Sequence, residues 1–450
     1  MQGKFELLDI AKKGKAKLHG NSLQVNGFSI DSRTLQHGEI YIALKGKNFD
    51  GKDFVDEAIT KGAQAVVADN YFDSKVPLLV VKDTEDFLKD LALANRLEFK
   101  GPVIGVTGSN GKTSSKEIIA SLLSSGMTYH KTIGNKNNQI GLPLSLADLD
   151  NTYDCSILEL GTSSPGEISL LASIAKPDIA LITNVSKSHL SGLGSIDLIA
   201  EEKGCIGTFE SNEGVLILNK DSRYFDYWKD TTNAKKVISF GIKKGSDFQV
   251  TSIAVDFSRN CTSFVLINQD KETECSIPGV GLHNPLNAAG ALAVCFSMGL
   301  DINKFVGNLK KVDLPQRRLS LHNLSKGSVL IDDSYNANPE SVKNSIDTLS
   351  ASNYQNKVIV LGEMLELGKD ADKLHKEVSE YAKTRVDSFI CLGEIWEEGV
   401  HHFGEDGILF LSKEELIDHV SSIIETDTVI LVKGSRSTRM DIVSDKLKDF

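Results

Sequence analysis

Short runs of apolar residues alternate along most of the chain with segments in which apolar residues recur at helical spacing. The run at 103–106 is followed by apolar residues at Ile118, Ile119, Leu122 and Leu123. Buried strands that alternate with helices are typical of βαβ units, so the pattern predicts a mostly parallel sheet. The further strands and helices expected in this series are 156–160, 166–175, 179–183, 196–209 and 215–218.

The first part of the chain, residues 1–98, is predicted to form a small α/β domain. Its apolar runs are short and separated by Gly and Asp turns, and Gly101-Pro102 marks its end. The expected strands are 40–44, 64–68 and 78–81, and the expected helices are 54–61 and 85–99.

A second α/β series occupies residues 314–450. The central domain, 99–313, ends with an antiparallel-looking stretch at 248–277 and a long helix after Pro285. We therefore expect an α/β protein of three domains, in which a Rossmann-like domain follows a central domain with a mostly parallel sheet. The expected C-terminal strands are 329–332, 358–361, 389–392, 408–411 and 429–432, and the helices are 340–351, 371–384, 413–424 and one after Ser437.

Composition narrows the class of protein. A length of 450 residues suits several domains that each bury a core, and a net charge of −11 without a long basic cluster argues against a nucleic-acid partner. The six cysteines include no CxxC pair, which favours reduced thiols in a cytoplasmic protein. We expect no signal peptide at the start and no membrane span, since the longest weakly polar stretch is 286–300.

The segment Gly105-Val-Thr-Gly-Ser-Asn-Gly-Lys-Thr113 is the strongest chemical signal. It lies between a predicted strand and a predicted helix N-terminus, where backbone N–H groups and the helix dipole favour a bound phosphate. Lys112 would meet the terminal phosphates, and the Thr113 hydroxyl would ligate magnesium. The spacing departs from the standard P-loop, because Val106 stands where that pattern needs glycine. A chance Gly-Lys-Thr sequence in a loop is the alternative.

Other polar residues follow the next strands of the predicted sheet, where ligands of open α/β sheets bind. Glu159 ends the strand at 156–160, and it is a reasonable Mg²⁺ ligand because that ion prefers oxygen donors. The strand at 179–183 leads to His189. If these residues have no function, Glu159 would be a carboxylate in a surface turn. Lys203, later in the chain, would be a charged residue on a helix surface.

The loop Thr107–Thr113 resembles the ATP-binding loop of the Mur ligase family. In that family a His-Leu element is followed, fourteen residues after the histidine, by a lysine that reacts with CO₂ to form a carbamate, and here Lys203 stands fourteen residues after His189. A carbamate carries the negative charge that a second magnesium needs, whereas a free lysine, with a pKa of ~10.4, is a cation. The resemblance implies ATP, two Mg²⁺ ions and the Lys203 carbamate as cofactors.

Further family elements extend over nearly the whole chain. The resemblance implies that the two asparagines of His283-Asn284-Pro-Leu-Asn287 contact the adenine. The alternative is that Asn284 caps a helix. Leu314-Pro-Gln-Arg-Arg318 contains an arginine for the terminal phosphate; Arg317 and Arg318 both qualify, and the distance to Asp332 favours Arg318. Asp333 is implied to bind a ribose hydroxyl.

Other segments indicate a branch of the family. Ile30-Asp31-Ser32-Arg33, Ala43-Leu-Lys-Gly46 and Asn48-Phe-Asp50-Gly51 resemble the module that binds the UDP of a nucleotide-linked sugar. The segments 134–143, 362–368 and 432–436 resemble the branch that adds D-alanyl-D-alanine to a UDP-N-acetylmuramoyl-tripeptide. As alternatives, the Gly and Asn clusters would be loops, and Lys433 and Arg436 a solvated pair.

The resemblance thus implies an ATP-dependent amide ligase that acts as a monomer on small-molecule substrates. The rivals are another Mur or folylpolyglutamate-type ligase and a nucleotide-binding protein without ligase activity. The predicted catalytic residues are Lys112, His189, Lys203 and Arg318, and the metal ligands Thr113, Glu159, His189 and carbamylated Lys203. The predicted nucleotide contacts are Gly108, Ser109, Asn110, Gly111, Lys112, Thr113, Asn284, Asn287, Arg318 and Asp333. The predicted substrate contacts are Ser32, Arg33, Gly46, Asp50, Asn135, Asn138, Gln139, Thr162, Ser163, Lys433, Ser435 and Arg436.

Overall fold

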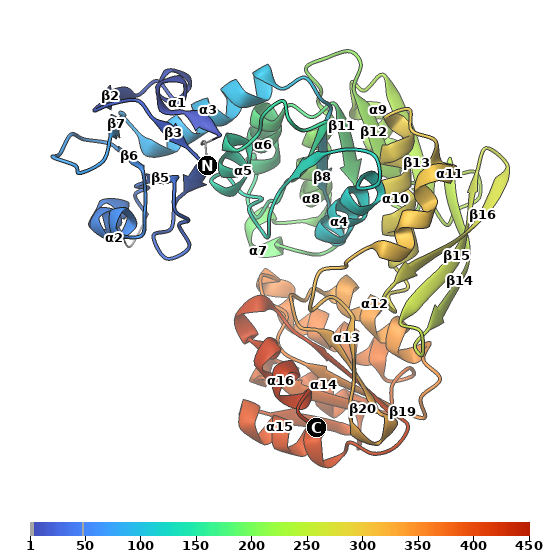
Figure 1. The fold of residues 1–450 in the computed structure, drawn as a ribbon. Coiled ribbons are helices and arrows are strands. Elements are labelled where there is room, and N and C mark those ends of the chain that lie inside the picture. Colours follow the sequence, from blue (N-terminus) through green and yellow to red (C-terminus); the bar gives the residue numbers. More distant parts are fainter. Residues whose placement is uncertain (1–3, 47–48) are drawn as a thin grey trace. The chain divides into compact units, whose positions relative to one another are not determined.

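The computed structural model describes residues 4–46 and 49–450 (Figure 1). Two predictions involve residues outside the described ranges. One concerns Asn48 in the segment predicted to bind UDP, and the other concerns residues 1–3, at the N-terminus where no signal peptide is expected. The chain divides into two compact units. The first consists of residues 1–105, 127–162 and 167–178, and the second of residues 106–126, 163–166 and 179–450.

A small α/β sheet occupies the beginning of the first unit. Its strands lie in the order β2-β7-β6-β5-β4, and all neighbours are parallel except β2 and β7. Helices α1 and α3 bury Leu7, Phe87 and Leu91 in its core, and Asp83 caps α3 by accepting from the N–H groups of Glu85 and Asp86. The elements are β1 (Phe5–Glu6), α1 (Leu7–Lys13), β2 (Lys17–His19), β3 (Gln24–Val25), β4 (Gly27–Ser29), β5 (Glu39–Ile42), α2 (Val55–Thr60), β6 (Ala65–Ala68), β7 (Leu78–Val80) and α3 (Thr84–Glu98).

The first unit also contains the strand order β8-β10-β9, in which β9 and β10 are parallel. Strand β8 begins in this unit and ends in the second. Asn95 of α3 donates to the carbonyl oxygens of Leu146 and Ala147, which ties α3 to the end of α5. The elements are β8 (Val103–Thr107), β9 (Tyr129–Lys131), α5 (Gly141–Ala147), β10 (Cys155–Glu159) and α6 (Glu167–Ala175).

In the second unit the strands run in the order β16-β15-β14-β13-β12-β11-β8. Strands β11 to β14 are parallel, whereas β14, β15 and β16 form the expected antiparallel stretch. Helix α8 is shorter than predicted because a 3-10 turn with Gly207 follows Gly204, and glycine is a poor helix former. The elements are α4 (Lys112–Leu123), β11 (Ile179–Ile182), α7 (Leu190–Leu193), α8 (Ile196–Gly204), β12 (Val215–Asn219), α9 (Phe225–Thr231), β13 (Lys236–Gly241), β14 (Phe248–Asp256), β15 (Cys261–Asn268), β16 (Lys271–Pro278), α10 (Asn284–Ser297) and α11 (Ile302–Phe305).

The C-terminal sheet of the second unit is covered by helices on both faces. Its strand order is β17-β18-β22-β19-β20-β21, with only β17 antiparallel to its neighbour. Side chains alternate across a strand, so Ile331 packs with α12 and α13 while Leu330 packs with α15 and α16. The elements are β17 (Ser320–Asn323), β18 (Val329–Asp333), α12 (Pro339–Ser350), β19 (Asn356–Leu361), α13 (Ala371–Ala382), β20 (Ser388–Leu392), α14 (Glu397–Phe403), β21 (Gly407–Phe410), α15 (Lys413–Ser422), β22 (Thr428–Lys433) and α16 (Met440–Leu447).

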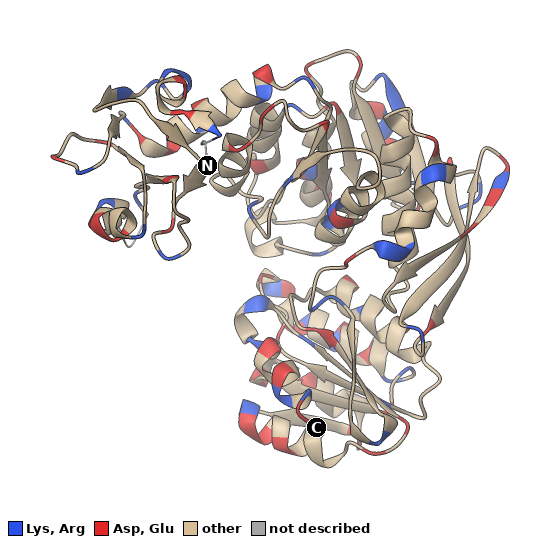
Figure 2. Cartoon of the chain, viewed as in Figure 1, with Lys and Arg blue, Asp and Glu red and all other residues tan. Residues whose placement is uncertain are grey.

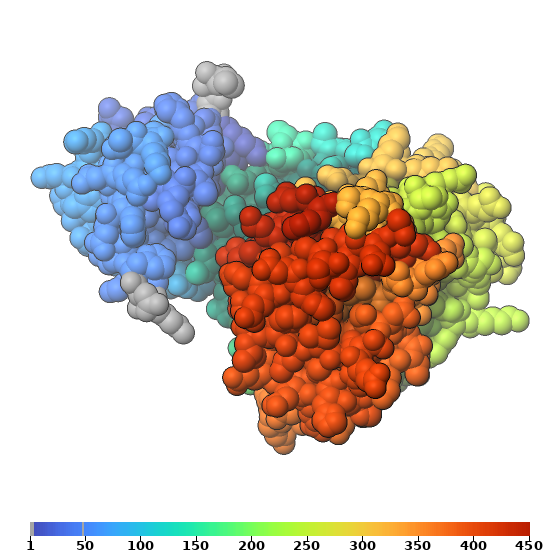
Figure 3. Space-filling model, turned by 90° about the horizontal axis from the view of Figure 1, so that it is seen from below, coloured from blue at the N-terminus to red at the C-terminus, as the bar shows by residue number. Residues whose placement is uncertain are grey.

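This two-sided arrangement is the Rossmann-like organisation that the sequence predicts for residues 314–450. The orange and red atoms of these residues form one continuous body in Figure 3. Acidic and basic residues are interspersed along their helices (Figure 2). Among the residues that the structure describes, no helix has the length and apolar character needed to cross a bilayer.

Candidate active site

Two glycines allow the predicted phosphate loop to pass close to its neighbours. Gly108 has φ +146°, and a Cβ there would lie 1.9 Å from the Thr183 hydroxyl oxygen. Gly111, the residue before α4, has φ +81°, and a Cβ there would lie 2.5 Å from Asn287 Oδ1. Both positions therefore require glycine, both for space and for backbone conformation.

The loop between β8 and α4 is fixed by the segment after β11. The N–H of Ser109 donates to the Asn184 carbonyl oxygen (3.0 Å), and the N–H of Asn110 donates to Asn184 Oδ1 (2.9 Å). The Thr183 hydroxyl donates to the Asn110 carbonyl oxygen (2.6 Å). Lys112 Nζ donates to the Gly108 carbonyl oxygen (2.7 Å), so its ammonium lies over the loop. This geometry keeps backbone N–H groups and a cation together at a helix N-terminus.

Lys112, His189 and Lys203, predicted as catalytic, lie close enough to influence one another. Lys203 is 1% exposed, and burial holds its pKa well below the usual lysine value, with the Lys112 charge acting in the same direction. Burial also lowers the pKa of His189, and the charges of Lys112 and Lys203 add to this effect. His189 Nδ1 lies 2.6 Å from Glu366 Oε2. The second unit therefore brings these three residues into one cluster.

Arg318 reaches the phosphate loop, whereas Arg317 does not. Arg318 Nη2 donates to the Thr113 hydroxyl oxygen (3.2 Å), and its guanidinium lies 4.2 Å from the centre of the Tyr335 ring. Arg317 instead forms ion pairs with Asp441 (3.0 Å) and Asp445 (2.8 Å). Of the two arginines left open by the sequence, Arg318 is the one that contacts the loop, and its contact with a phosphate stays a prediction.

Asp333 and Lys433, predicted for different ligands, contact each other. Lys433 Nζ lies 2.6 Å from Asp333 Oδ2 and donates to the Asn336 carbonyl oxygen (2.9 Å). The two residues face each other in the parallel register of β18 and β22. Asp333 also accepts from the Ser345 hydroxyl (2.7 Å). In this arrangement Asp333 holds Lys433 in place.

The neighbouring residues Ser435 and Arg436 differ in environment. Ser435 is buried, and its hydroxyl oxygen accepts from the N–H of Leu365 (2.8 Å). Arg436 is largely exposed, and its guanidinium lies 5.9 Å from the centre of the Tyr335 ring. Tyr335 therefore lies near both Arg318 and Arg436.

The asparagines predicted to meet adenine are both buried. Asn284 is the first residue of α10, and His283 occupies the capping position without a side-chain cap bond, so Asn284 does not cap the helix. Asn287 lies beside Gly111, and its buried Nδ2 has no hydrogen-bond partner among the described residues. Asn110, in turn, accepts from Asn338 Nδ2 (2.8 Å).

Glu159 belongs to the first unit and is 2% exposed. Its Oε1 accepts from Asn137 Nδ2 (2.7 Å), whereas its Oε2 is buried without a hydrogen-bond partner among the described residues. A buried carboxylate oxygen without a donor is costly unless a cation satisfies it. This orphan oxygen fits the predicted role of Glu159 as a metal ligand.

The residues between 135 and 163 that are predicted to bind substrate partly contact neighbouring residues of the protein. Asn138 Oδ1 accepts from the N–H groups of Ile140 and Gly141 at the start of α5, and Gln139 donates to Glu167 (3.2 Å). The Asn135 carbonyl oxygen accepts from the N–H of Asn137. Thr162 is buried in the first unit, and Ser163 belongs to the second, where its carbonyl oxygen lies beside Gly192.

The residues predicted to hold UDP follow the carboxyl ends of β4 and β5. Ser32 donates to Glu57 (2.9 Å), and the exposed Arg33 pairs with Asp31 (2.7 Å), whose pKa it lowers to about 2. The Gly46 N–H donates to the Phe49 carbonyl oxygen (3.0 Å), and Asp50 accepts from the N–H of Lys52 (3.0 Å). Loops at the carboxyl ends of parallel strands are the usual place for a ligand.

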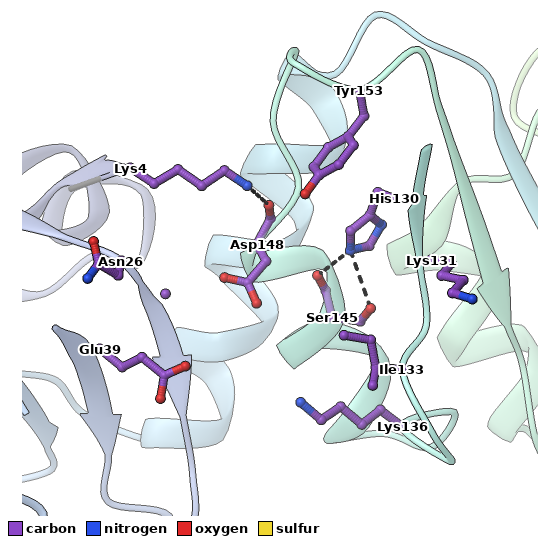
Figure 4. A pocket seen from close by; sticks show the side chains of 11 residues that line it. Lys4, Asn26, Glu39, His130, Lys131, Ile133, Lys136, Ser145, Asp148 and Tyr153 are labelled. Atoms are coloured by element: carbon purple, nitrogen blue, oxygen red, sulfur yellow. Dashed lines mark hydrogen bonds between the residues drawn. The ribbon is translucent and has the colours of Figure 1, made fainter. Parts of the chain in front are cut away.

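A pocket of about 320 Å³ lies elsewhere in the first unit, at the amino ends of β4 and β5 (Figure 4). Figure 4 shows the carboxylates of Glu39 and Asp148 directed into the same space. Burial raises the pKa of Asp148 to about 6 and lowers that of His130 to about 4. None of the residues predicted for chemistry lines this pocket. Its lining consists of Lys4, Asn26, Gly27, Glu39, His130, Lys131, Ile133, Lys136, Ser145, Asp148 and Tyr153.

We expect Asp148→Asn to stabilise the protein at pH 7.5 and not at pH 4. Because the folded-state pKa of Asp148 is raised, the folded state binds the proton more tightly, and its stability falls as pH rises from the unfolded value towards about 6. Asparagine removes this penalty, so the free energy of unfolding should rise by about 2 kcal/mol at pH 7.5. Urea unfolding at both pH values measures the difference.

Asp150→Asn is the matched control, because the pKa of Asp150 is lowered although burial opposes this shift, and the carboxylate pairs with Lys4 (2.9 Å). This variant should lose stability at pH 7.5. Equal stability of wild type and Asp148→Asn at both pH values would contradict the account of Asp148.

A glycine-rich loop between a strand and a helix N-terminus, with Lys112, His189 and Lys203 near one another, is typical of a nucleotide-binding α/β protein. Three family models match this chain: the Mur ligase family catalytic domain at residues 24–96, the Mur ligase middle domain at 106–295 and the Mur ligase glutamate ligase domain at 317–436. The chain belongs to the Mur ligase family, as its sequence motifs predict.

Relatives with known names match nearly the full length. UDP-N-acetylmuramoyl-tripeptide–D-alanyl-D-alanine ligase of Escherichia coli K12 is 34% identical over 437 residues, which is 96% of each chain. The crystal structure of MurF from Acinetobacter baumannii has a TM-score of 0.89 at 27% identity and covers 98% of each chain. MurF ligase from Thermotoga maritima, solved in complex with ADP, has a TM-score of 0.81 at 28% identity, with 94% of this chain and 97% of that chain covered. The predicted three-domain α/β fold is confirmed.

Proposed function

We propose that the chain is an ATP-dependent, ADP-forming ligase that joins D-alanyl-D-alanine to the carboxylate of UDP-N-acetylmuramoyl-tripeptide in peptidoglycan precursor synthesis. The observation that carries this proposal is the similarity to the Escherichia coli enzyme of that name over 96% of the chain. The proposal places the protein in the cytoplasm, as a monomer that acts on small molecules.

The proposed nucleotide is ATP, and the ADP complex of the Thermotoga maritima relative supports it. Lys112 would neutralise the terminal phosphates as a point charge, and Arg318, already in contact with Thr113, would lie beside them. Gly108 to Gly111 would supply backbone N–H groups. The proposal keeps Asn284 and Asn287 for the adenine and Asp333 for the ribose, although Asp333 also holds Lys433.

Two magnesium ions would balance the phosphate charge, held by Thr113, Glu159, His189 and the Lys203 carbamate. The orphan oxygen of Glu159 supports its place in this set. Burial of Lys203 supports the carbamate, because only a neutral amine reacts with CO₂ and a lowered pKa makes that form available. The donors are oxygen-rich, as magnesium prefers.

The substrates would be held by the other predicted residues. Ser32, Arg33, Gly46 and Asp50 would hold the UDP, and Asn135, Asn138, Gln139, Thr162 and Ser163 the remainder of the muramoyl-peptide. Lys433, Ser435 and Arg436 would meet the incoming dipeptide. The support for Lys433 is its fixed position, since Asp333 and the Asn336 carbonyl oxygen hold its ammonium.

The reaction takes place in two steps. A carboxylate oxygen of the tripeptide attacks the γ-phosphorus of ATP, and the bond to the β-phosphate oxygen breaks to release ADP. The amine of D-alanyl-D-alanine then attacks the acyl carbon, loses a proton, and displaces phosphate. Phosphoryl transfer depends chiefly on positioning and charge neutralisation, which the loop, Lys112 and Arg318 supply.

The acyl phosphate should form from ATP and the muramoyl-tripeptide without D-alanyl-D-alanine, because the nucleophile is the substrate carboxylate. Borohydride reduction of the mixture, followed by mass spectrometry, should find the tripeptide reduced at one carboxyl group. A control without ATP should leave the tripeptide unchanged. Detection of a phosphorylated side chain of the protein on the reaction path would contradict the proposed sequence of steps.

A further inference from the structure

Glu366 contacts the loop that contains His189 through both its side chain and its backbone. Its Oε2 lies 2.6 Å from His189 Nδ1, and its carbonyl oxygen accepts from the N–H of Ser191 (3.1 Å). Both Glu366 and His189 have left-handed backbone conformations, with φ of +63° and +54°. Such conformations in non-glycine residues persist where the surrounding structure fixes them, often at functional sites.

The segment that carries Glu366 is fixed within the C-terminal α/β domain. The N–H of Met364 donates to Nε2 of the buried His375 (3.0 Å), and the N–H of Leu365 donates to the Ser435 hydroxyl oxygen (2.8 Å). The N–H of Ser435 donates to the Glu363 carbonyl oxygen (3.0 Å). Hydrogen bonds within the C-terminal domain therefore fix the backbone that precedes Glu366.

The contact determines which nitrogen of His189 is available. The Glu366 carboxylate oxygen lies 2.6 Å from Nδ1, so this nitrogen faces Glu366. Nε2 is then the ring nitrogen left for a further ligand. Histidines that bind metals usually contact a carboxylate or carbonyl through the other ring nitrogen in this way, which fixes the ring and its tautomer.

We propose that Glu366 is a positioning residue for His189: it orients the imidazole from the C-terminal domain through Nδ1, so that Nε2 would be the nitrogen left to bind magnesium. This inference rests on the proposed function, in which His189 is a magnesium ligand. His189 follows β11 of the nucleotide-binding part, whereas Glu366 follows β19 of the C-terminal domain. The orientation of His189 therefore depends on the contact of the C-terminal domain with the loop at 189–191. By linkage, a bound ion strengthens that contact by the same factor.

The direct test is Mn²⁺ binding, measured by electron paramagnetic resonance on the full chain with a non-hydrolysable ATP analogue and bicarbonate. Glu366→Ala should weaken one class of bound Mn²⁺ by about 10-fold, as loss of an outer carboxylate commonly does. Glu366→Gln, which keeps an oxygen acceptor but no charge, should show a smaller loss. An affinity within twofold of wild type for Glu366→Ala would overturn the proposal.

Glu377→Gln is the matched control, because Glu377 also joins the two domains, through Lys187 (3.7 Å), without contacting His189. It should leave Mn²⁺ affinity unchanged. The double variant that combines Glu366→Ala with His189→Ala should bind Mn²⁺ no more weakly than His189→Ala alone, because Glu366 acts through His189. Additive losses would contradict that route.

The positioning role and the proposed function fail separately. If wild type makes no product from the muramoyl-tripeptide and D-alanyl-D-alanine while Glu366→Ala still weakens Mn²⁺ binding, the function is wrong and the positioning role stands. If wild type makes the product and Mn²⁺ binding is unaffected by Glu366→Ala, the positioning role is wrong and the function stands.

Discussion

Replacing Lys112 by alanine should lower the rate of phosphate release by about 10²–10³-fold, the usual effect of removing one group that stabilises charge in a transition state. The Lys112 ammonium lies over the loop, where it donates to the Gly108 carbonyl oxygen, and the residue is only partly buried. Its loss should therefore leave the fold intact. The measurement is steady-state phosphate release with both substrates, together with a thermal melt of each variant.

Lys244→Ala is the matched control for Lys112→Ala. Lys244 is an exposed lysine of the second unit in the turn after β13, and its removal should change neither rate nor stability. Lys112→Arg should remain slow, because the planar guanidinium does not replace a compact ammonium at a phosphate. A folded Lys112→Ala protein with a rate within threefold of wild type would contradict the assignment of the phosphate loop.

Lys203→Ala should be nearly inactive, and a small carboxylate should restore part of its activity. The side chain is buried, so alanine leaves an enclosed space where formate or acetate supplies the oxygens of the missing carbamate. Wild-type activity should fall when CO₂ and bicarbonate are removed and return when bicarbonate is added. Phosphate release measures both effects. It is compared with and without formate or acetate at a concentration on the order of 0.1 M, and with and without bicarbonate.

Lys116→Ala serves as the control for chemical rescue, because Lys116 is also a buried lysine of the second unit. Any activity that this variant loses should not return with formate. If Lys203→Ala remains active and wild type is indifferent to CO₂, Lys203 carries no carbamate and is a structural lysine only.

The sequence predicted the elements whose signals are local. The phosphate loop is contiguous, so its strand, its glycines and the helix that follows it were readable from the sequence. The five parallel strands of the C-terminal sheet are apolar because helices cover both faces, and each lies within two residues of its expected range, whereas the antiparallel strand β17 was not expected. The boundaries expected near residues 98 and 313 stay predictions.

Elements with weak local signals were missed. Strands β1 to β4 contain only two or three residues each, too few for an alternating pattern to emerge. Helix α5 contains Gly141 and Pro143 and follows an Asn-rich segment, so it resembled a loop, although all of its residues are buried. Burial from tertiary packing outweighed its poor helix propensity.

The pairings within the candidate site were not readable from the sequence. Asp333 meets Lys433 through the register of two parallel strands, and His189 meets Glu366 through the packing of one domain on another. Both pairs join residues that are distant in the chain, and no local pattern encodes such a contact. A spacing argument favoured Arg318 over Arg317, and Arg318 is the one that contacts Thr113, although its role at the phosphate stays a prediction.

The central claim is tested most directly by measuring phosphate release with purified UDP-muramoyl-peptides of different lengths, offered against single amino acids and against D-alanyl-D-alanine. The account predicts rapid release only when ATP, the UDP-N-acetylmuramoyl-tripeptide and D-alanyl-D-alanine are present together, with a UDP-muramoyl-pentapeptide as the product. Release that prefers a shorter muramoyl-peptide with a single amino acid, or a folate substrate with glutamate, would contradict it.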